Sequence, residues 1–181
     1  SLCTTVRGRK VLRKLQATDG LSDNIVKKIV LYDSNLLLGT QENGLCIYDL
    51  KQNSFQKQQN ESVWKYGALN DIILNKQTHE IWVATESGGL LYCENPEERM
   101  FSFKQQSDRL FSTVYSVAID HQNNVWVAIE RGLFRSHGQW LTFLNQFNGV
   151  DIKNVHEVAF LDSNRMVVSI KNKVLLLSFN T

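Results

Sequence analysis

Short apolar runs and polar turns alternate along the whole chain, and this pattern is typical of β-strands. The runs are rich in Val, Ile, Leu and aromatic residues, and they are bounded by Asn, Gly, Asp or Ser. They predict strands in groups of four, which we label a to d in chain order. The predicted strands span residues 25–32, 36–41, 45–48 and 54–57 in the first group, 69–74, 80–85, 89–93 and 100–104 in the second, and 114–119, 125–129, 132–135 and 140–143 in the third.

These groups are copies of one repeat. The stretch HEIWVATESGGLLYC, which begins at His79, is echoed by NNVWVAIERGLFRS, NLLLGTQENGLCIYD and NRMVVSIKNKVLLLSF. Corresponding positions are 45, 44 and 41 residues apart, which is the spacing of β-propeller blades. In each copy a large apolar residue stands two positions before a small one: Leu37 before Gly39, Trp82 before Ala84, Trp126 before Ala128 and Val167 before Ser169. This column predicts closely nested sheets, with Trp82 and Trp126 buried between them.

A second column of the repeat marks turns. Asp33, Asn75, Asp120 and Asp162 each follow an apolar run and precede a polar segment. Short Asx side chains in such positions accept hydrogen bonds from the backbone two residues on and start tight turns. We therefore assign these four residues a turn role rather than a catalytic one.

The repeat predicts an all-β fold, a sector of a β-propeller that forms a single domain. Three complete four-stranded blades span residues 20–60, 61–107 and 108–146, and partial blades at both termini span residues 1–19 and 147–181. The segment KVLRKL, which begins at Lys10, also suits a short helix by its spacing, but the neighbouring repeats favour a strand. Strand c is supplied by both partial blades, so a sector of a larger propeller fits better than a self-contained ring.

Composition and charge narrow the classes of partner. Of the 181 residues, 43% are hydrophobic and 21% are charged, as in globular domains. The formal net charge of +2 gives no reason to expect a nucleic-acid partner, and no apolar run has the roughly 20 residues of a membrane helix, so we expect no membrane segment in this chain. Cys3, Cys46 and Cys93 form no CxxC pair, which argues against a disulfide framework or a zinc site. We expect no metal and no cofactor.

The stretch GLSDNIVKKIVLYDSNLLLGTQENGLCIYD resembles the two-component regulator propeller repeat. The matching positions are Leu21, Asn24, Val26, Asp33, residues 36–40, Gly44, Leu45 and Tyr48. The next two repeats place Ala where that family has Gly, and the fourth lacks the tryptophan. The resemblance implies the sensor β-propeller of a bacterial hybrid or two-component receptor, outside the cytoplasm in the periplasm. In that family the ligands are often oligosaccharide fragments.

Propellers place their d-to-a connections and b-to-c turns on one face, around the mouth of the central channel. In this chain those segments carry aromatic side chains beside charged ones, which suits a sugar, because its apolar face stacks on a ring while its hydroxyls form hydrogen bonds. The candidate ligand-binding residues are Trp64, Tyr66, Glu86, Arg109, Phe111, Glu130, Arg131 and Asp151. The alternative is that Trp64 and Phe111 fill gaps between blades.

The pattern favours a non-enzymatic ligand-sensing domain whose partner is an oligosaccharide or another small ligand. A protein–protein interaction scaffold without a small ligand is a second hypothesis, and a propeller lyase or glycosidase is a third. No catalytic motif is present, and His79, His121 and His137 fall on separate predicted turns. A sector exposes apolar faces at both ends, so we expect the remaining blades of a larger propeller, or a second copy of the chain, to cover them.

Overall fold

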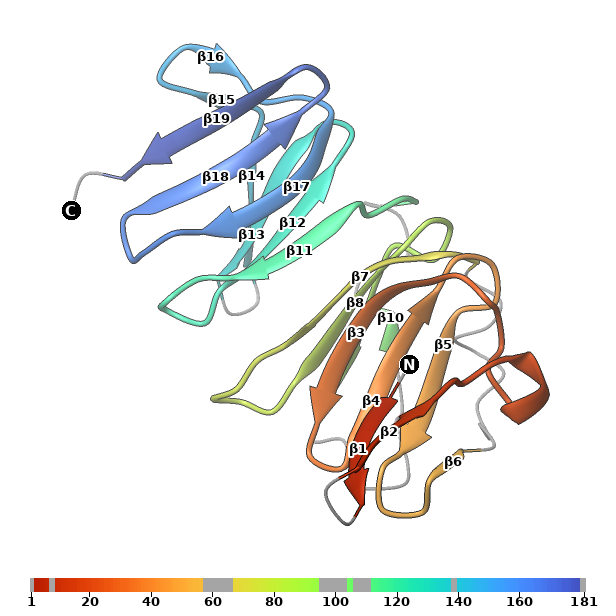
Figure 1. The fold of residues 1–181 in the computed structure, drawn as a ribbon. Helices are drawn as coiled ribbons and strands as arrows, with labels where there is room; N and C mark the ends of the chain where they lie inside the picture. Colours follow the sequence, from red (N-terminus) through yellow and green to blue (C-terminus); the bar gives the residue numbers. More distant parts are fainter. Residues whose placement is uncertain are drawn as a thin grey trace.

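The computed structural model describes residues 2–6, 9–56, 67–94, 104–105, 112–137 and 140–179. Within this part of the chain the regular structure is β, apart from one 3-10 helix, η1 (Ala17–Asp19). The strands form separate antiparallel sheets, and each sheet is built from consecutive segments of the chain (Figure 1). The first is a hairpin of β1 (Leu2–Val6) and β2 (Arg9–Arg13).

Four larger sheets follow within the described residues, and we number them in chain order. Sheet I contains β3 (Val26–Tyr32), β4 (Asn35–Thr40), β5 (Leu45–Asp49) and β6 (Ser54–Phe55). Sheet II contains β7 (Leu69–Leu74), β8 (Ile81–Thr85), β9 (Leu90–Cys93) and β10 (Lys104–Gln105). Sheet III contains β11 (Ser116–Ile119), β12 (Val125–Ile129), β13 (Gly132–His137) and β14 (Trp140–Leu144). Sheet IV contains β17 (Val155–Phe160), β18 (Arg165–Ile170) and β19 (Lys173–Ser178).

The strand pattern read from the sequence is confirmed. Strands β7 and β12 begin and end at the predicted residues, and most other ends differ by one or two positions. The segment that begins at Lys10 lies in a strand, where Leu12 pairs with Cys3. Residues 100–103, where the last strand of the second group was predicted to begin, lie outside the described residues. Two short elements were not predicted: η1, and a hairpin of β15 (Gln146–Phe147) and β16 (Val150–Asp151) in the last d-to-a connection.

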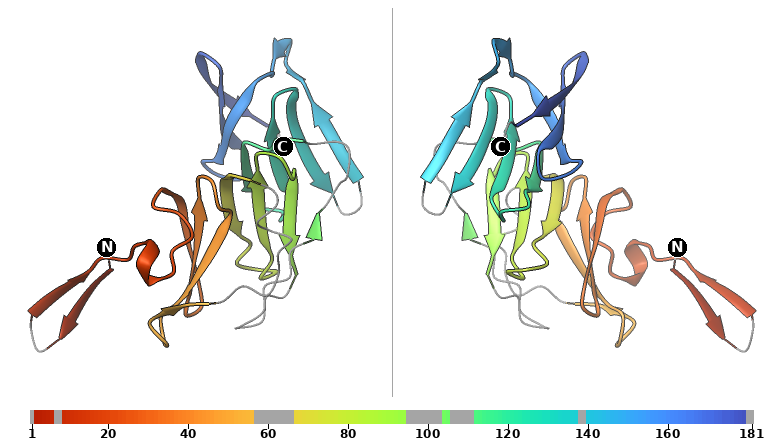
Figure 2. Two further views of the ribbon diagram at one scale, coloured as in Figure 1. Left: turned by 90° about the vertical axis from the view of Figure 1, so that its right-hand side faces the viewer. Right: turned by 90° about the vertical axis from the view of Figure 1, so that its left-hand side faces the viewer.

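The sheets are stacked face to face in chain order, with their first strands together on one side. Strand a of each sheet contacts strand a of the next, in the order β3, β7, β11 and β17. Figure 2 shows the sheets fanned in this order, with the hairpin of β1 and β2 projecting beyond sheet I on the side away from sheet II. The b-to-c turns and the d-to-a connections therefore lie at one end of the fan, and the a-to-b turns at the other.

Apolar cores fill the seams between consecutive sheets. Trp82 lies in the seam between sheets II and III, and Trp126 in the seam between sheets III and IV. They are 8% and 3% exposed, which confirms their predicted burial. The small residue two positions after each large one lets neighbouring sheets approach each other closely. At Gly39, for example, a Cβ would lie 3.1 Å from the Ile72 side chain of the next sheet. The column of large and small residues is thus a packing device.

The Asx column lies at turns, as predicted, and three of its four members accept the expected backbone hydrogen bond. The Oδ1 atoms of Asn75, Asp120 and Asp162 accept hydrogen bonds from backbone N–H groups two residues on, at 2.9–3.0 Å. Asp33 differs because it lies in a tighter turn, where it adopts a φ of 50°. The opposite ends of two sheets are closed by threonine: the Thr40 and Thr85 hydroxyls donate to the carbonyl oxygens of Gly44 and Gly89 across the b-to-c turns.

Candidate ligand-binding surface

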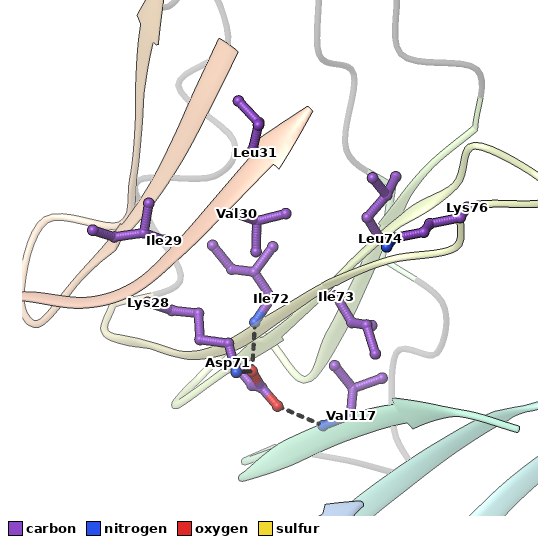
Figure 3. Close-up of a pocket in the computed structure, with 10 residues that line it drawn as sticks. All are labelled: Lys28, Ile29, Val30, Leu31, Asp71, Ile72, Ile73, Leu74, Lys76 and Val117. Atoms are coloured by element: carbon purple, nitrogen blue, oxygen red, sulfur yellow. Dashed lines mark hydrogen bonds and ion pairs between the residues drawn. The ribbon is translucent and has the colours of Figure 1, made fainter. Parts of the chain in front are cut away.

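The first strands of sheets I, II and III border an open groove of about 390 Å³ (Figure 3). We call it the inner-strand groove, and its lining comprises residues 28–31, 71–74, 76 and 117. Most of these side chains are apolar, and the exceptions are Lys28, Asp71 and Lys76. Its volume lies in the range of small-ligand sites, and its lining likewise combines apolar walls with a few polar groups.

Asp71 ties three sheets together at this groove. Its Oδ2 accepts hydrogen bonds from the Ser116 hydroxyl at 3.0 Å and the Val117 N–H at 3.2 Å, both from sheet III. Its Oδ1 lies 2.7 Å from the Nζ of Lys28 in sheet I (Figure 3). The Asp71 side chain is only 12% exposed, so these donors compensate the cost of burying its charge.

Lys28 brings a positioned cation to the groove. Its side chain is 45% exposed, and the ion pair with Asp71 fixes where the ammonium lies. An ammonium has three donors, so one bond to Asp71 leaves two for solvent or for a ligand oxygen. Lys76 adds a second exposed ammonium to the same groove.

A β-bulge recurs near the start of the first strand of three sheets, at the end of the fan that carries the b-to-c turns. The register shifts lie between Val26 and Lys28 in sheet I, between Leu69 and Asp71 in sheet II, and between Val155 and Glu157 in sheet IV. Each shift inserts one residue, and these residues are Lys27, Asn70 and His156. Bulges re-aim side chains and are common beside functional sites.

Two bulge side chains make contacts to a neighbouring sheet. The amide of Asn70 donates to the Val114 carbonyl oxygen at 2.9 Å. The ring of His156 lies 5.1 Å from that of Tyr115, which holds the corresponding position in sheet III. His156 is exposed and Tyr115 partly buried. Together they place an aromatic pair at the same end as the predicted binding face.

Four of the predicted ligand-binding residues are described, and all four are exposed at that end. Glu86 lies in the turn between β8 and β9, Glu130 and Arg131 lie in the turn between β12 and β13, and Asp151 lies in β16. The turns are anchored through their backbones, because the carbonyl oxygens of Glu86 and Glu130 accept hydrogen bonds from Thr113 and Asn154. The other candidates, Trp64, Tyr66, Arg109 and Phe111, lie outside the described residues.

At this face the described side chains contact residues near them in sequence and do not form one cluster. Asp151 accepts a hydrogen bond from the Gln146 amide at 3.0 Å and pairs with Lys153 at 3.5 Å, both nearby in sequence. Glu86 and Glu130 lie in the b-to-c turns of different sheets. The described residues contain no group of three or more His, Cys, Asp and Glu side chains placed to hold a metal ion. Cys46 and Cys93 are buried thiols that form no disulfide, and burial raises the pKa of the Cys46 thiol.

Neither the groove nor the contacts of Asp71 were predicted from the sequence. The available signal was a single acidic residue inside the apolar run LNDIIL, which is unusual for a buried strand. Its partners Lys28 and Ser116 lie 43 and 45 positions away, in other sheets. No local pattern could have joined them.

Solved structures with a similar fold include propellers and extracellular domains. PorZ, an essential surface component of the type-IX secretion system of Porphyromonas gingivalis, matches 95% of this chain with 29% of its own (TM-score 0.66, 17% identity). The extracellular domain of the putative one-component system BT4673 from B. thetaiotaomicron matches 96% with 29% of its own (TM-score 0.52, 16% identity). The β-propeller domain of Cps50 (Swd1) from Myceliophteria thermophila matches 84% with 50% of its own (TM-score 0.61, 12% identity).

These similarities show that the protein has a β-propeller fold. They agree with the propeller fold that the resemblance to the two-component regulator propeller repeat implies. The chain spans about 29% of the length of PorZ and of the BT4673 domain. No family model matches the sequence, and no curated protein is similar to it. Among the described residues, no helix has the length and apolar character needed to cross a membrane.

Proposed function

We propose that this chain is a ligand-sensing, non-enzymatic part of the extracytoplasmic domain of a bacterial two-component-type signalling receptor. The observation that carries the proposal is the inner-strand groove, in which the Lys28 ammonium is held by a buried carboxylate and remains half exposed. The fold shared with the BT4673 extracellular domain supports an extracytoplasmic location. The sequence resemblance supports the same assignment.

A saccharide is the ligand class that best suits the groove and its mouth. The ammonium groups of Lys28 and Lys76 donate to hydroxyl or carboxylate oxygens, and the aromatic pair of Tyr115 and His156, at the b-to-c end of the fan, offers ring faces to the apolar side of a sugar. Glu86, Glu130 and Arg131 at the same end would contact the outer residues of an oligosaccharide.

Signalling follows from the position of the groove between sheets. A ligand that contacts β3, β7 and β11 together favours one spacing of sheets I to III over others. Binding therefore shifts a pre-existing equilibrium between arrangements of the sheets, and the downstream part of the receptor responds to the shift. The hydrogen bonds and the ion pair of Asp71 link the three sheets, and we expect them to transmit this shift.

Calorimetric titration with defined saccharides tests this function. One panel should be neutral and a second should carry carboxylates, because the cationic groove favours the second. We expect saturable heat with at least one member, and Lys28→Met should weaken that binding about tenfold or more, since it removes the ammonium but keeps the stem. Lys51→Met, which changes an exposed lysine in the turn between β5 and β6 at the opposite end of the fan, is the matched control and should bind as the parent does. Absence of heat with every saccharide, or parental affinity in Lys28→Met, would refute the proposal.

A protein-interaction scaffold is the second candidate. It is favoured by the similarity to PorZ, which is a surface component of a secretion system. In this case the exposed turns with Glu86 and Glu130 would contact another protein. Photo-reactive residues at these two positions would then cross-link to a partner, and no saccharide would give heat.

A further inference from the structure

Sheets I and IV each present one face that no sheet of the described chain covers. We call the face of a sheet toward its predecessor the incoming face, and the face toward its successor the outgoing face. The incoming face of sheet I is covered in part by Leu15 and Leu21, which pack on Leu38, Cys46 and Tyr48. The first strand of that face stays open, since Ile29 is 61% exposed.

The register of the sheets shows what normally covers this position. Ile29 pairs with Leu38 across the first two strands, just as Ile72 pairs with Val83, Val117 with Val127 and Val158 with Val168. In sheets II, III and IV these equivalents of Ile29 are only 1%, 3% and 4% exposed. Each is buried against the outgoing face of the preceding sheet.

The outgoing face of sheet IV is open in the same way. Val174 pairs with Ser169 of the small-residue column, and its equivalents Leu45, Leu90 and Leu133 pair with Gly39, Ala84 and Ala128. These three leucines are 0%, 3% and 0% exposed, whereas Val174 is 72% exposed. Leu176 on the same face is 58% exposed. Two exposed aliphatic side chains at positions that are elsewhere buried mark an unfilled seam.

The two open faces are the two halves of one kind of seam. Leu45 and Ile72 share the core between sheets I and II, Leu90 and Val117 share the next, and Leu133 and Val158 share the third. Val174 and Ile29 occupy the same two positions, but within one molecule neither packs on a residue of the other kind. They lie at opposite ends of the chain, so one molecule does not bring them together.

Charge is complementary across the same two faces. The position next to Ile29 is Lys28 in sheet I, and its equivalents are Asp71, Ser116 and Glu157. Lys28 pairs with Asp71 across the first seam, and Ser116 donates to Asp71 across the second. Glu157 is exposed at the end of the series. A seam between sheet IV and another sheet I would place Glu157 beside a lysine.

Two arcs like the superposed part of this chain together match one solved propeller domain. The chain superposes over 84% of its length on 50% of the Cps50 β-propeller domain. A head-to-tail interface closes when its rotation completes a circle, and two half rings meet that condition with two identical seams. Among the described strands β19 pairs only with β18, and its open edge and the projecting hairpin of β1 and β2 lie at these same ends.

We propose that a second copy of this chain covers both open faces, with Val174 of each molecule packed on Ile29 of the other in a closed dimeric ring. Light scattering coupled to size exclusion tests this directly. The monomer mass is 20.8 kDa, so the ring has twice this mass, 41.6 kDa. Ile29→Glu and Val174→Lys should each reduce the mass to that of the monomer. Both side chains are exposed within one molecule, so each variant keeps its own core, and circular dichroism checks this.

A mixture of the two variants gives the sharpest readout. In a mixed ring one seam is native, with Val174 on Ile29, and the other sets the introduced lysine against the introduced glutamate, so the 41.6 kDa species should return. Val150→Lys, which changes an exposed aliphatic residue in β16 away from both faces, is the matched control and should remain dimeric. A monomeric parent chain would mean that further sheets of a longer polypeptide cover the faces, and would overturn the proposal. A dimer that survives both substitutions, or open-ended polymers, would overturn it as well.

Discussion

Asp120 holds together the turn and the tryptophan of sheet III, and its replacement by asparagine is the most informative single perturbation. Its Oδ2 accepts hydrogen bonds from the Trp126 indole N–H and the Asn124 amide, both at 2.9 Å, and lies 3.3 Å from Arg135. Its Oδ1 accepts the turn hydrogen bond from the Gln122 N–H. Asp120→Asn keeps the Oδ1 acceptor and exchanges the Oδ2 acceptor for a donor.

Sheet II already shows the consequence of that exchange. Asn75 holds the position of Asp120, and its Oδ1 accepts from the Gln77 N–H at 2.9 Å, so the turn is intact. Its Nδ2 and the indole Nε1 of Trp82 are both buried without a hydrogen-bond partner. The tryptophan can therefore be buried without an acceptor, but at a cost in stability.

The magnitude follows from the contacts that Asp120→Asn removes. A buried indole N–H left without an acceptor costs about 1–3 kcal/mol, and the partly exposed pair with Arg135 adds up to about 1 kcal/mol. We expect the free energy of unfolding to fall by about 1–4 kcal/mol. Urea unfolding followed by tryptophan fluorescence, at one fixed protein concentration, measures it.

The same variant carries a pH signature. Burial alone would raise the pKa of Asp120, but the hydrogen bonds from Trp126 and Asn124 outweigh it and hold the pKa below its usual value. The stability that the carboxylate contributes is therefore present above the unfolded pKa of about 3.9, and is lost as the pH falls through the lower folded pKa. The difference in stability between parent and Asp120→Asn should be constant near neutrality and shrink in acid.

Asp162→Asn is the matched control, because Asp162 has the same turn role without a tryptophan above it. Its Oδ1 accepts from the Asn164 N–H, and its Oδ2 pairs with the exposed Arg165. A surface pair of this kind is worth at most about 1 kcal/mol. If Asp120→Asn cost no more than Asp162→Asn, the proposed role of the Trp126 acceptor would be wrong.

Two further substitutions test the packing of the sheets. Trp126→Ala should cost about 3–5 kcal/mol in urea unfolding, because it empties the seam where the indole contacts Phe160 and Phe179; an unchanged midpoint would contradict the buried placement. Gly132→Ala should be far more destabilising than Gly149→Ala, although both glycines have positive φ. A Cβ at Gly132 would collide with the Leu144 carbonyl oxygen, whereas nothing lies within 4 Å of a Cβ at Gly149. At the exposed Gly149, backbone strain should lower the stability by only about 1–2 kcal/mol. Equal losses at both glycines would show that the collision at Gly132 is relieved.

The strands, turns and buried tryptophans could be predicted because their signals are local and repeated. Alternation gave β7 and β12 without error, and the spacing of Trp82 and Trp126 from their small neighbours gave the seams. The turn role of Asp120 and Asp162 followed from the same column. Each of these inferences needs only residues that lie close together in the chain.

The groove could not be predicted because its chemistry comes from contacts between sheets. Lys28, Asp71 and Ser116 share one repeat position, yet a base, an acid and a hydroxyl look unrelated in an alignment of the repeats. The bulges that insert Lys27, Asn70 and His156 were also invisible, because one extra residue hardly disturbs an apolar pattern. Exposure at Ile29 and Val174 likewise required the register of whole sheets.

The arrangement of sheets face to face around a common side is the claim on which the groove and the dimer both depend. Nuclear Overhauser contacts measure it directly, with one pair of protons for each seam. We expect contacts between Gly39 Hα and the Ile72 δ-methyl, between the Ser116 and Asp71 side chains, and between the rings of Trp126 and Phe160, which lie 5.7 Å apart. All three together would establish the nested sheets. Absence of any one from a folded sample would contradict them.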